Sequence, residues 1–320
     1  EVAYKKGLRH LTLLHDNDAS VPLGDVFTNP VQFGGLTPFG IEVIKIVRAR
    51  PLLGTIVEIK LNDVLSQQQA HQAIDAAYIC IEKVQNLMSF HDDQSELSLL
   101  NRQAHRMPIQ VHPWTYAVLT RAQRIYTASQ GLFDCTIANL LMEWQLLPQH
   151  SFHLENLDVS QAQLELQSNH YVYYKNPIAI DLGGIAKGFA IDIAIQCLRQ
   201  HGIRSAVINA GGDLRVLGTT PEHIMLRDPK NPQQLQNIGE LSQGSIASSS
   251  IYYSQQQYQS NKVSALVDPI TRQPILTPHS FSVIAPLAWV ADALTKVIAI
   301  SANPNHPCLE HFSATAFILQ

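Results

Sequence analysis

The sequence is poor in charge of either sign and contains no long apolar run. Charged residues make up 15% of the 320, against about 25% in an average globular protein, and the formal net charge is -4. Because nucleic-acid binding needs a basic surface, this balance argues against nucleic acid as the main partner. No stretch reaches the roughly 18 apolar residues of a membrane-spanning helix, so no transmembrane segment is predicted. Hydrophobic residues still make up 46%, enough for a sizeable core.

Cysteine is also scarce, and common metal motifs are missing. Cys80, Cys135, Cys197 and Cys308 lie far apart without a Cys-x-x-Cys pair, which indicates neither a zinc site nor a disulfide framework. Because their neighbours are apolar, we expect buried thiols. The 14 histidines show no His-Glu-x-x-His spacing, and no Gly-x-Ser-x-Gly elbow is present. Zinc proteases and α/β-hydrolases are therefore not indicated.

The chain divides into an N-terminal extension and one domain. Residues 1–43 contain Gly, Pro, Asn and Asp at short intervals, which prevents long periodic elements and predicts an irregular extension. From residue 44 to residue 320, β-branched runs are interspersed with amphipathic segments. We therefore predict a single compact α+β domain over 44–320.

Residue spacing predicts the elements of this domain. Apolar residues at helical spacing predict helices over 67–89, 113–129, 185–200 and 288–301. Apolar and β-branched runs predict strands over 41–47, 55–61, 171–174, 177–181, 205–209, 214–217 and 281–285, with 48–54 connecting the first two as a hairpin. The order strand, helix, strand over 177–209 predicts a right-handed crossover, with ligand-binding turns at the carboxyl ends of parallel strands.

A glycine-rich turn over residues 181–188 is a candidate anion site. Gly183 and Gly184 separate the predicted strand from the predicted helix, where backbone amides can approach an anion closely. Lys187 lies in the first helical turn, where the helix dipole disfavours a cation unless a phosphate or carboxylate shares the site. The alternative for Lys187 is an exposed surface lysine. Residues 210–213 form a second Gly-Gly turn, expected at the same edge of the sheet.

The last predicted helix carries three polar residues on one face. Thr295 and Lys296 follow Asp292 by three and four positions, which places the three side chains next to one another. An Asp and a Thr supply the hard oxygen ligands that Mg²⁺ prefers. An ion pair between Asp292 and Lys296 is an equally good interpretation.

Taken together, these segments resemble the FAD:protein FMN transferase family, also called ApbE-like flavin transferases. In chain order, the matching segments are residues 53–55, 88–101, 131–136 with Trp144, 181–192, 209–213, 268–269 and 291–294. One such motif is weak evidence, whereas this many in the right order across about residues 45–320 are specific.

The resemblance implies a reaction and a site. Such enzymes bind FAD with Mg²⁺ at the pyrophosphate, transfer FMN to a Ser or Thr hydroxyl of an acceptor protein, and release AMP. FAD would be contacted by Leu53, His91, Leu132, Phe133, Asp134, Asp181, Lys187 and the backbone of Leu266; the metal by the Gly184 carbonyl, Asp292 and Thr295; and Lys187 and Asp292 would be the catalytic residues. Family members often work outside the cytoplasmic membrane, so we expect a periplasmic or membrane-associated location, with the cytoplasm as the alternative.

Three departures from the family pattern leave other activities open. The first lies in one motif, where Ala265 replaces a family histidine and Arg272 replaces a glycine. The second is Lys296, which stands where the family usually has a threonine. The third is Leu53, which replaces a methionine. Loss of a general base would slow transfer by about 10²–10⁴-fold. One alternative is therefore an FAD-binding protein with degenerate catalysis. Another is an FAD pyrophosphatase that produces free FMN and AMP.

Overall fold

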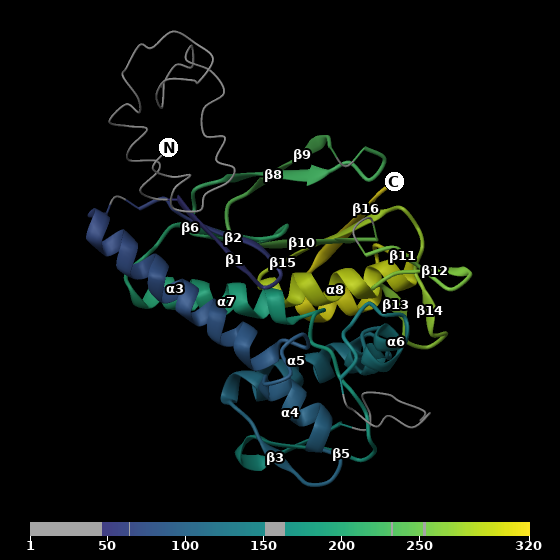
Figure 1. Ribbon diagram of the computed structural model, residues 1–320. Coiled ribbons are helices and arrows are strands. Elements are labelled where there is room, and N and C mark those ends of the chain that lie inside the picture. The colour runs from purple at the N-terminus through teal and green to yellow at the C-terminus, as the bar shows by residue number, and fades with distance from the viewer. Residues whose placement is uncertain (1–46, 64, 151–163, 232, 252–253) are drawn as a thin grey trace.

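The computed structural model describes residues 47–63, 65–150, 164–231, 233–251 and 254–320. The extension predicted over 1–43, and most of the strand predicted over 41–47, lie outside these ranges. Within them the chain has the predicted mixed α+β fold, built around one large sheet (Figure 1).

The central sheet has seven strands, and every pairing in it is antiparallel. In spatial order its strands are β1 (Val47–Leu52), β2 (Thr55–Leu61), β6 (Ala206–Ala210), β7 (Asp213–Leu217), β10 (Gly244–Ser250), β15 (Ser280–Ala285) and β16 (Thr315–Leu319). The predicted hairpin of the first two strands is present but turns later than expected. Leu53 and Gly54 both have positive φ, 56° and 70°, as two-residue hairpin turns require, so residues 48–52 belong to β1 rather than to a connection.

Residues 177–181, predicted as a strand, join no sheet. The buried amide of Asn101 pairs with both backbone groups of Ile180: Nδ2 donates to the carbonyl and Oδ1 accepts from the N–H, each at 2.9 Å. The N–H of Asp181 donates to the Cys135 carbonyl at 2.8 Å. The predicted parallel crossover is therefore wrong, because a side chain satisfies backbone groups that a neighbouring strand would otherwise have paired.

Helices cover one face of the sheet, and a two-stranded ribbon covers part of the other (Figure 1). The three helices on the sheet are α3 (Gln67–Met88), α7 (Ala186–Gln200) and α8 (Ala288–Ser301), and the ribbon consists of β8 (Glu222–Arg227) and β9 (Leu235–Leu241). With α5 (Pro113–Ala128), the four helices predicted from spacing are confirmed. None of the helices in the described ranges combines the length and apolarity needed to cross a membrane.

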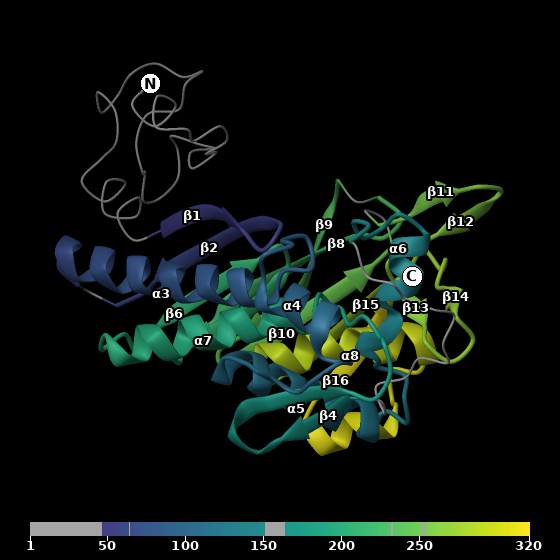
Figure 2. The same cartoon turned by 60° about the horizontal axis from the view of Figure 1, so that its bottom comes forward.

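The smaller elements gather around the ends of these layers (Figure 2). They are α4 (Glu96–Gln103), α6 (Ala138–Glu143), β3 (Ile109–Gln110), β4 (Leu164–Gln167), β5 (Tyr171–Tyr174), β11 (Gln256–Tyr258), β12 (Asn261–Val263), β13 (Val267–Asp268) and β14 (Gln273–Pro274). Ser95 caps α4 by accepting the Ser98 N–H at 3.0 Å. This local cap explains why a helix begins directly after the polar segment.

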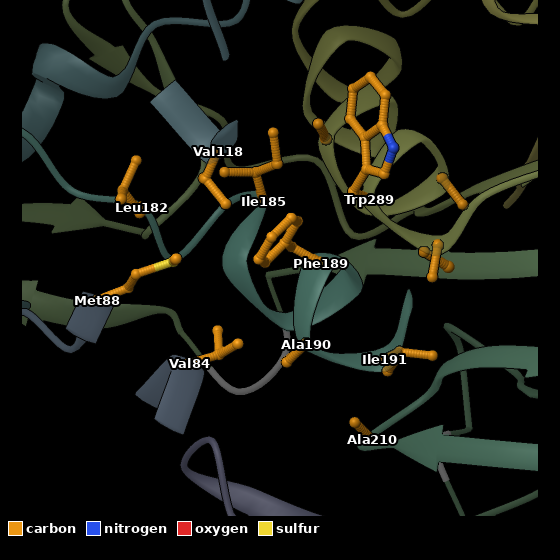
Figure 3. Close-up of a cluster of buried hydrophobic side chains, with 14 of the residues drawn as sticks. Val84, Met88, Val118, Leu182, Ile185, Phe189, Ala190, Ile191, Ala210 and Trp289 are labelled. Carbon is orange, nitrogen blue, oxygen red and sulfur yellow. The ribbon is translucent and has the colours of Figure 1, made fainter. Parts of the chain in front are cut away.

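The core lies between the helices and the sheet. Figure 3 shows buried side chains from several helices around Phe189 of α7, among them Met88 of α3, Val118 of α5 and Trp289 of α8. All four cysteines lie in the described ranges and none forms a disulfide; three are buried and Cys80 is partly exposed. The prediction of buried free thiols is thus confirmed for Cys135, Cys197 and Cys308, whereas Cys80 is free but not fully buried.

Helices α7 and α8 have no N-terminal caps of their own. Their N-cap residues are Ile185 and Leu287, whose side chains cannot accept a hydrogen bond. The first N–H groups of a helix have no partners within the helix, so a buried helix start needs acceptors from elsewhere. A carboxylate is the most favourable acceptor there, because it also interacts with the helix dipole.

Each of the two helices supplies this carboxylate to the other. Asp292 of α8 accepts the Gly188 N–H of α7 through Oδ2 at 3.0 Å. Asp192 of α7 accepts the N–H groups of Ala288 and Trp289, one at each carboxylate oxygen, both at 3.0 Å. These reciprocal caps hold the two helix starts side by side.

Gly188 is required where α7 meets the start of α8. A Cβ at this position would lie 2.3 Å from the carbonyl oxygen of Ala288 and 2.7 Å from the Cα of Trp289. Both atoms belong to the backbone, so no flexible side chain can move aside. Any side chain at residue 188 would push the two helices apart and lengthen the caps.

We predict that Gly188→Ala destabilises the protein by about 3 kcal/mol, because overpacking a backbone contact forces the helices to separate. The free energy of unfolding would be measured by urea denaturation. Gly202→Ala is the matched control, since a Cβ there meets nothing within 4 Å, although its φ of 80° makes a loss of about 1–2 kcal/mol expected. An equal or smaller loss at Gly188 would contradict the close approach.

Candidate functional site

One large cavity collects most of the residues predicted for the site. Its volume is about 1200 Å³, more than the roughly 300–1000 Å³ of typical small-molecule sites. The predicted residues that line it are His91, Leu132, Phe133, Asp134, Asp181, Gly184, Lys187 and Leu266. Ala265, at the position of the family histidine, and Lys296 also line it. The cavity is therefore large enough for a ligand of dinucleotide size.

The Gly-Gly turn before α7 forms one wall. Asp181 Oδ1 accepts the Gly183 N–H at 3.1 Å, which folds the turn back on itself. A Cβ on Gly184 would lie 3.4 Å from the ring of Phe133 and 3.6 Å from Cε of Lys296. The absence of a side chain at Gly184 thus lets an aromatic ring and a lysine stem approach the same turn.

Lys187 is an ion-paired cation at the cavity wall. Its Nζ lies 2.5 Å from Oδ2 of Asp213 on β7, whose side chain is 4% exposed, while that of Lys187 is 33% exposed. Burial alone would lower the pKa of Lys187, but the charges of Asp213 and Asp292 outweigh it, so the pKa is raised. Lys187 is therefore charged at neutral pH. This pairing rules out the alternative of an ordinary surface lysine.

The segment with Phe133 and Asp134 is held by a local cap. Asp134 precedes the short 3₁₀ helix Cys135–Ile137 and accepts the Thr136 N–H at 2.8 Å and the Thr136 hydroxyl at 2.7 Å, both through Oδ1. This cap orients the loop so that Phe133 and Asp134 face the cavity.

The backbone carbonyl of Leu266 is hydrogen-bonded within its own turn. Its carbonyl oxygen accepts the Ile275 N–H at 2.8 Å and the Ser264 hydroxyl at 3.0 Å. Arg272, at the family glycine, adopts the left-handed conformation with φ 57°. The turn thus has an arginine in a left-handed conformation that a glycine would adopt at lower energetic cost.

Three predicted residues are not among the described residues that line the cavity: Leu53, Asp292 and Thr295. Leu53 lies in the β1–β2 turn, packs against the core, and donates its N–H to Gln85 Oε1 at 2.6 Å. Asp292 and Thr295 are fully buried inside α8. The sequence placed them on the right helix face but could not show that this face is covered by Lys296 and α7.

The arrangement around Asp292 does not fit a divalent metal ion. Asp292 Oδ1 pairs with Lys296 Nζ, and Oδ2 accepts the Gly188 N–H. Thr295 Oγ1 donates to the Asp292 carbonyl at 2.7 Å and lies 2.7 Å from Ser249 Oγ. The described ranges contain no group of three or more His, Cys, Asp or Glu side chains able to hold a metal. Of the two interpretations of this helix face, the ion pair is the one observed.

Sequence reasoning missed the far wall of the cavity. It is formed by residues 222–228 of β8 and the following loop, by Ser248, Ser249 and Ser250 of β10, and by His279. No motif marks these residues, and the pairing of β10 with β15, which places its serines, is not visible from the sequence. Only the Gly-Gly turn over 210–213 was a usable signal, and Gly211 and Gly212 do line the cavity.

Comparison with known proteins gives consistent results. The model of the ApbE family matches residues 53–307. The chain is 26% identical to the FAD:protein FMN transferase of Treponema pallidum over 275 residues, which covers 77% of this chain and 76% of that protein. It is 27% identical to the protein of the same name from Vibrio cholerae over 209 residues, which covers 61% of this chain and 63% of that protein.

Solved structures agree with these similarities. The crystal structure of the ApbE protein from Thermotoga maritima has a TM-score of 0.69 at 26% identity, and the match covers 80% of this chain and 86% of that chain. The flavin transferase ApbE from Vibrio cholerae has a TM-score of 0.69 at 22% identity, covering 85% and 92%, which supports the fold.

We predict that Asp181→Asn stabilises the protein at neutral pH. Burial raises the pKa of Asp181, against opposing effects of the Gly183 amide, His91 and Lys296. The unfolded chain therefore releases this proton at lower pH than the folded protein does, and stability falls as pH rises from the ordinary value towards the raised one. The amide keeps the acceptor for Gly183 but carries no charge. The melting temperature at pH 7 should rise by about 2 °C or more, and the gain should vanish below about pH 4.

Asp228→Asn is the control of opposite sign. The Lys230 amide and the Gln236 side chain lower the pKa of Asp228, so its ionised form stabilises the fold and is lost as pH falls. Asp228→Asn should not raise the melting temperature at pH 7. A destabilised Asp181→Asn at pH 7 would show that its charge is needed by the fold.

Proposed function

The chain belongs to the ApbE family, and from that premise we propose that it is an FAD:protein FMN transferase. In this proposal it transfers FMN from FAD to a Ser or Thr hydroxyl of an acceptor protein and releases AMP. The observation that carries the proposal is the position of Lys187 and Lys296, which both line one cavity beside the Gly-Gly turn. Two cations at one wall match the two negative charges of a diphosphate.

The rest of the cavity supports a flavin dinucleotide as the ligand. Apolar side chains occupy the wall next to the Gly-Gly turn and part of the far wall; they include Leu132, Phe133, Ile137, Leu141, Leu146, Leu147, Ile224 and Leu226. An aromatic ring system is stabilised by such a surface, whereas the phosphates need the lysines. The cavity thus combines an apolar region and a cationic region, as the two chemical halves of a flavin nucleotide require.

The reaction proceeds by attack of an oxygen on phosphorus. The acceptor hydroxyl forms a bond to the phosphorus attached to riboflavin, the bond from that phosphorus to the bridging oxygen breaks, and AMP departs with this oxygen. The hydroxyl proton is released to solvent or to the departing phosphate. Charge neutralisation and positioning dominate such transfers, so the lysines contribute by holding the diphosphate and stabilising the charge that develops on it.

The resemblance also implied Mg²⁺, and the oxygens around Asp292 are already engaged by Lys296, Gly188 and Ser249. We therefore include no metal in the steps above. Ala265 replaces the family histidine, so position 265 supplies no general base, and transfer should be slower by about 10²–10⁴-fold than with one.

The function is tested by incubating the full chain with FAD and an acceptor peptide that carries a Thr. We expect the peptide to gain the mass of one FMN residue and AMP to appear in equal amount, because transfer couples the two products. A known transferase acting on the same peptide is the control for the choice of acceptor. Intact FAD bound to the protein would indicate a carrier, and free FMN with AMP would indicate a pyrophosphatase; either result would contradict transfer.

A second prediction separates ligand binding from folding at Lys187. Lys187→Met leaves buried Asp213 without its partner, so we expect a loss of about 2 kcal/mol in stability, less than the 3–5 of fully buried pairs because a third of the Lys187 side chain is exposed. FAD affinity should fall about tenfold or more, since a charge-assisted contact is lost.

The double variant Lys187→Met with Asp213→Asn should recover stability but not FAD affinity, because it removes the unpaired charge without restoring the cation. Affinity would be measured by quenching of flavin fluorescence and stability by thermal unfolding. Lys175→Met is the matched control, as Lys175 pairs with Glu165 on the surface. If the double variant binds FAD as tightly as the wild type, Lys187 does not contact the ligand and serves only to neutralise Asp213.

A further inference from the structure

Lys296 occupies the space between the buried carboxylate of α8 and the cavity. Its Nζ pairs with Asp292 Oδ1 and donates to the Asp292 carbonyl at 2.9 Å. Its side chain is 21% exposed, whereas that of Asp292 is fully buried. The stem passes the Gly184 turn, and Lys296 lines the cavity while Asp292 is not among the described lining residues. The ammonium is therefore the charged group of α8 among the described residues that line the cavity.

The oxygens that hold this ammonium belong to the set expected to hold a divalent cation. Mg²⁺ needs about six oxygens near 2.0–2.1 Å in octahedral geometry and would have to displace the ammonium from Asp292. Asp292 Oδ2 also holds the start of α7 through Gly188, and the Thr295 hydroxyl is engaged with the Asp292 carbonyl and with Ser249. A metal ion that binds Oδ1 of Asp292 would therefore have to displace the Lys296 ammonium.

An ammonium in this place can still bind a phosphate. A lysine has three N–H donors, and Asp292 accepts two of them. The third remains for a ligand oxygen on the cavity side. Lys296 also exerts its charge on the neighbouring carboxylates, since it is among the groups that oppose the burial-driven rise in the pKa of Asp181 and of Asp213. Its field thus extends along the wall that includes Lys187.

We propose that Lys296 is a built-in cation that takes the position of the divalent metal ion, so that this chain binds the diphosphate of FAD without Mg²⁺. The proposal rests on the proposed function for the identity of the ligand. The ammonium of Lys296 is covalently held in place and adds its positive charge to that of Lys187 on the same wall. Unlike a metal, they remain in place when no ligand is bound and are insensitive to chelators.

The experiment exchanges the ammonium for an oxygen ligand in the full chain. FAD affinity of the wild type, Lys296→Thr and Lys296→Met is measured by flavin fluorescence in EDTA and in excess Mg²⁺. Binding of Mn²⁺, as a paramagnetic probe, is measured by electron paramagnetic resonance with and without FAD. Lys175→Thr controls for loss of a lysine elsewhere, and circular dichroism confirms that each variant is folded.

We expect the wild type and Lys175→Thr to bind FAD equally well in EDTA and in Mg²⁺, within about twofold, and to bind no stoichiometric Mn²⁺. Lys296→Thr should lose about tenfold or more in affinity in EDTA, recover it in Mg²⁺, and bind one Mn²⁺. Lys296→Met keeps the length of the side chain without its charge, so its loss should persist in Mg²⁺.

Two results would overturn the proposal. One is wild-type protein that binds one Mn²⁺ and gains more than about fivefold in FAD affinity from Mg²⁺. The other is Lys296→Thr that binds no Mn²⁺ with or without FAD, because the position would then not be a cation site. If no form of the protein binds FAD, the proposed function fails, while the Mn²⁺ measurements without FAD still decide whether Lys296 holds a cation position.

Discussion

The reciprocal capping of α7 and α8 by Asp292 and Asp192 is the interaction on which the rest of the structure depends. Two helices that begin in the protein interior expose N–H groups that neither can satisfy alone, and each resolves this with a carboxylate from the other. Asp192 is in turn neutralised by Arg215 of β7, which ties the pair of helices to the central sheet. The turn before α7 is thereby fixed relative to α8, and so is the cavity wall.

The same network explains why a functional cation can sit beside a structural anion. Asp292 uses Oδ2 for the start of α7 and Oδ1 for Lys296, so one carboxylate serves the fold on one side and the cavity on the other. Asp213 on β7 holds Lys187 through Oδ2. Each lysine is held by a buried partner, which reduces the conformational entropy lost when a ligand binds.

The sequence predicts the local parts of this molecule well and the long-range parts poorly. Helical periodicity identifies α7 and α8 within a residue or two, and the predicted turn at Gly183–Gly184 leads into α7 with Lys187 in its first turn. Residues 177–181 look like a strand, yet Asn101, 79 residues from Ile180, takes the place of a strand neighbour. Spacing alone leaves the Asp292 ion pair and a metal site equally possible. In the structure Lys296 occupies Oδ1 and the Gly188 N–H, 104 residues away, occupies Oδ2, so both carboxylate oxygens are engaged.

The long sequence separation between the paired helix ends has a kinetic consequence. We expect the two caps to form late in folding, because about a hundred residues must first bring the two helix starts together. The pair therefore behaves as one cooperative unit in local opening, and fraying at either start releases the other. The cavity wall that contains the Gly183–Gly184 turn, Lys187 and Lys296 exists only in molecules in which the chain from β6 to β15 is folded. A nascent or partly unfolded chain lacks this wall.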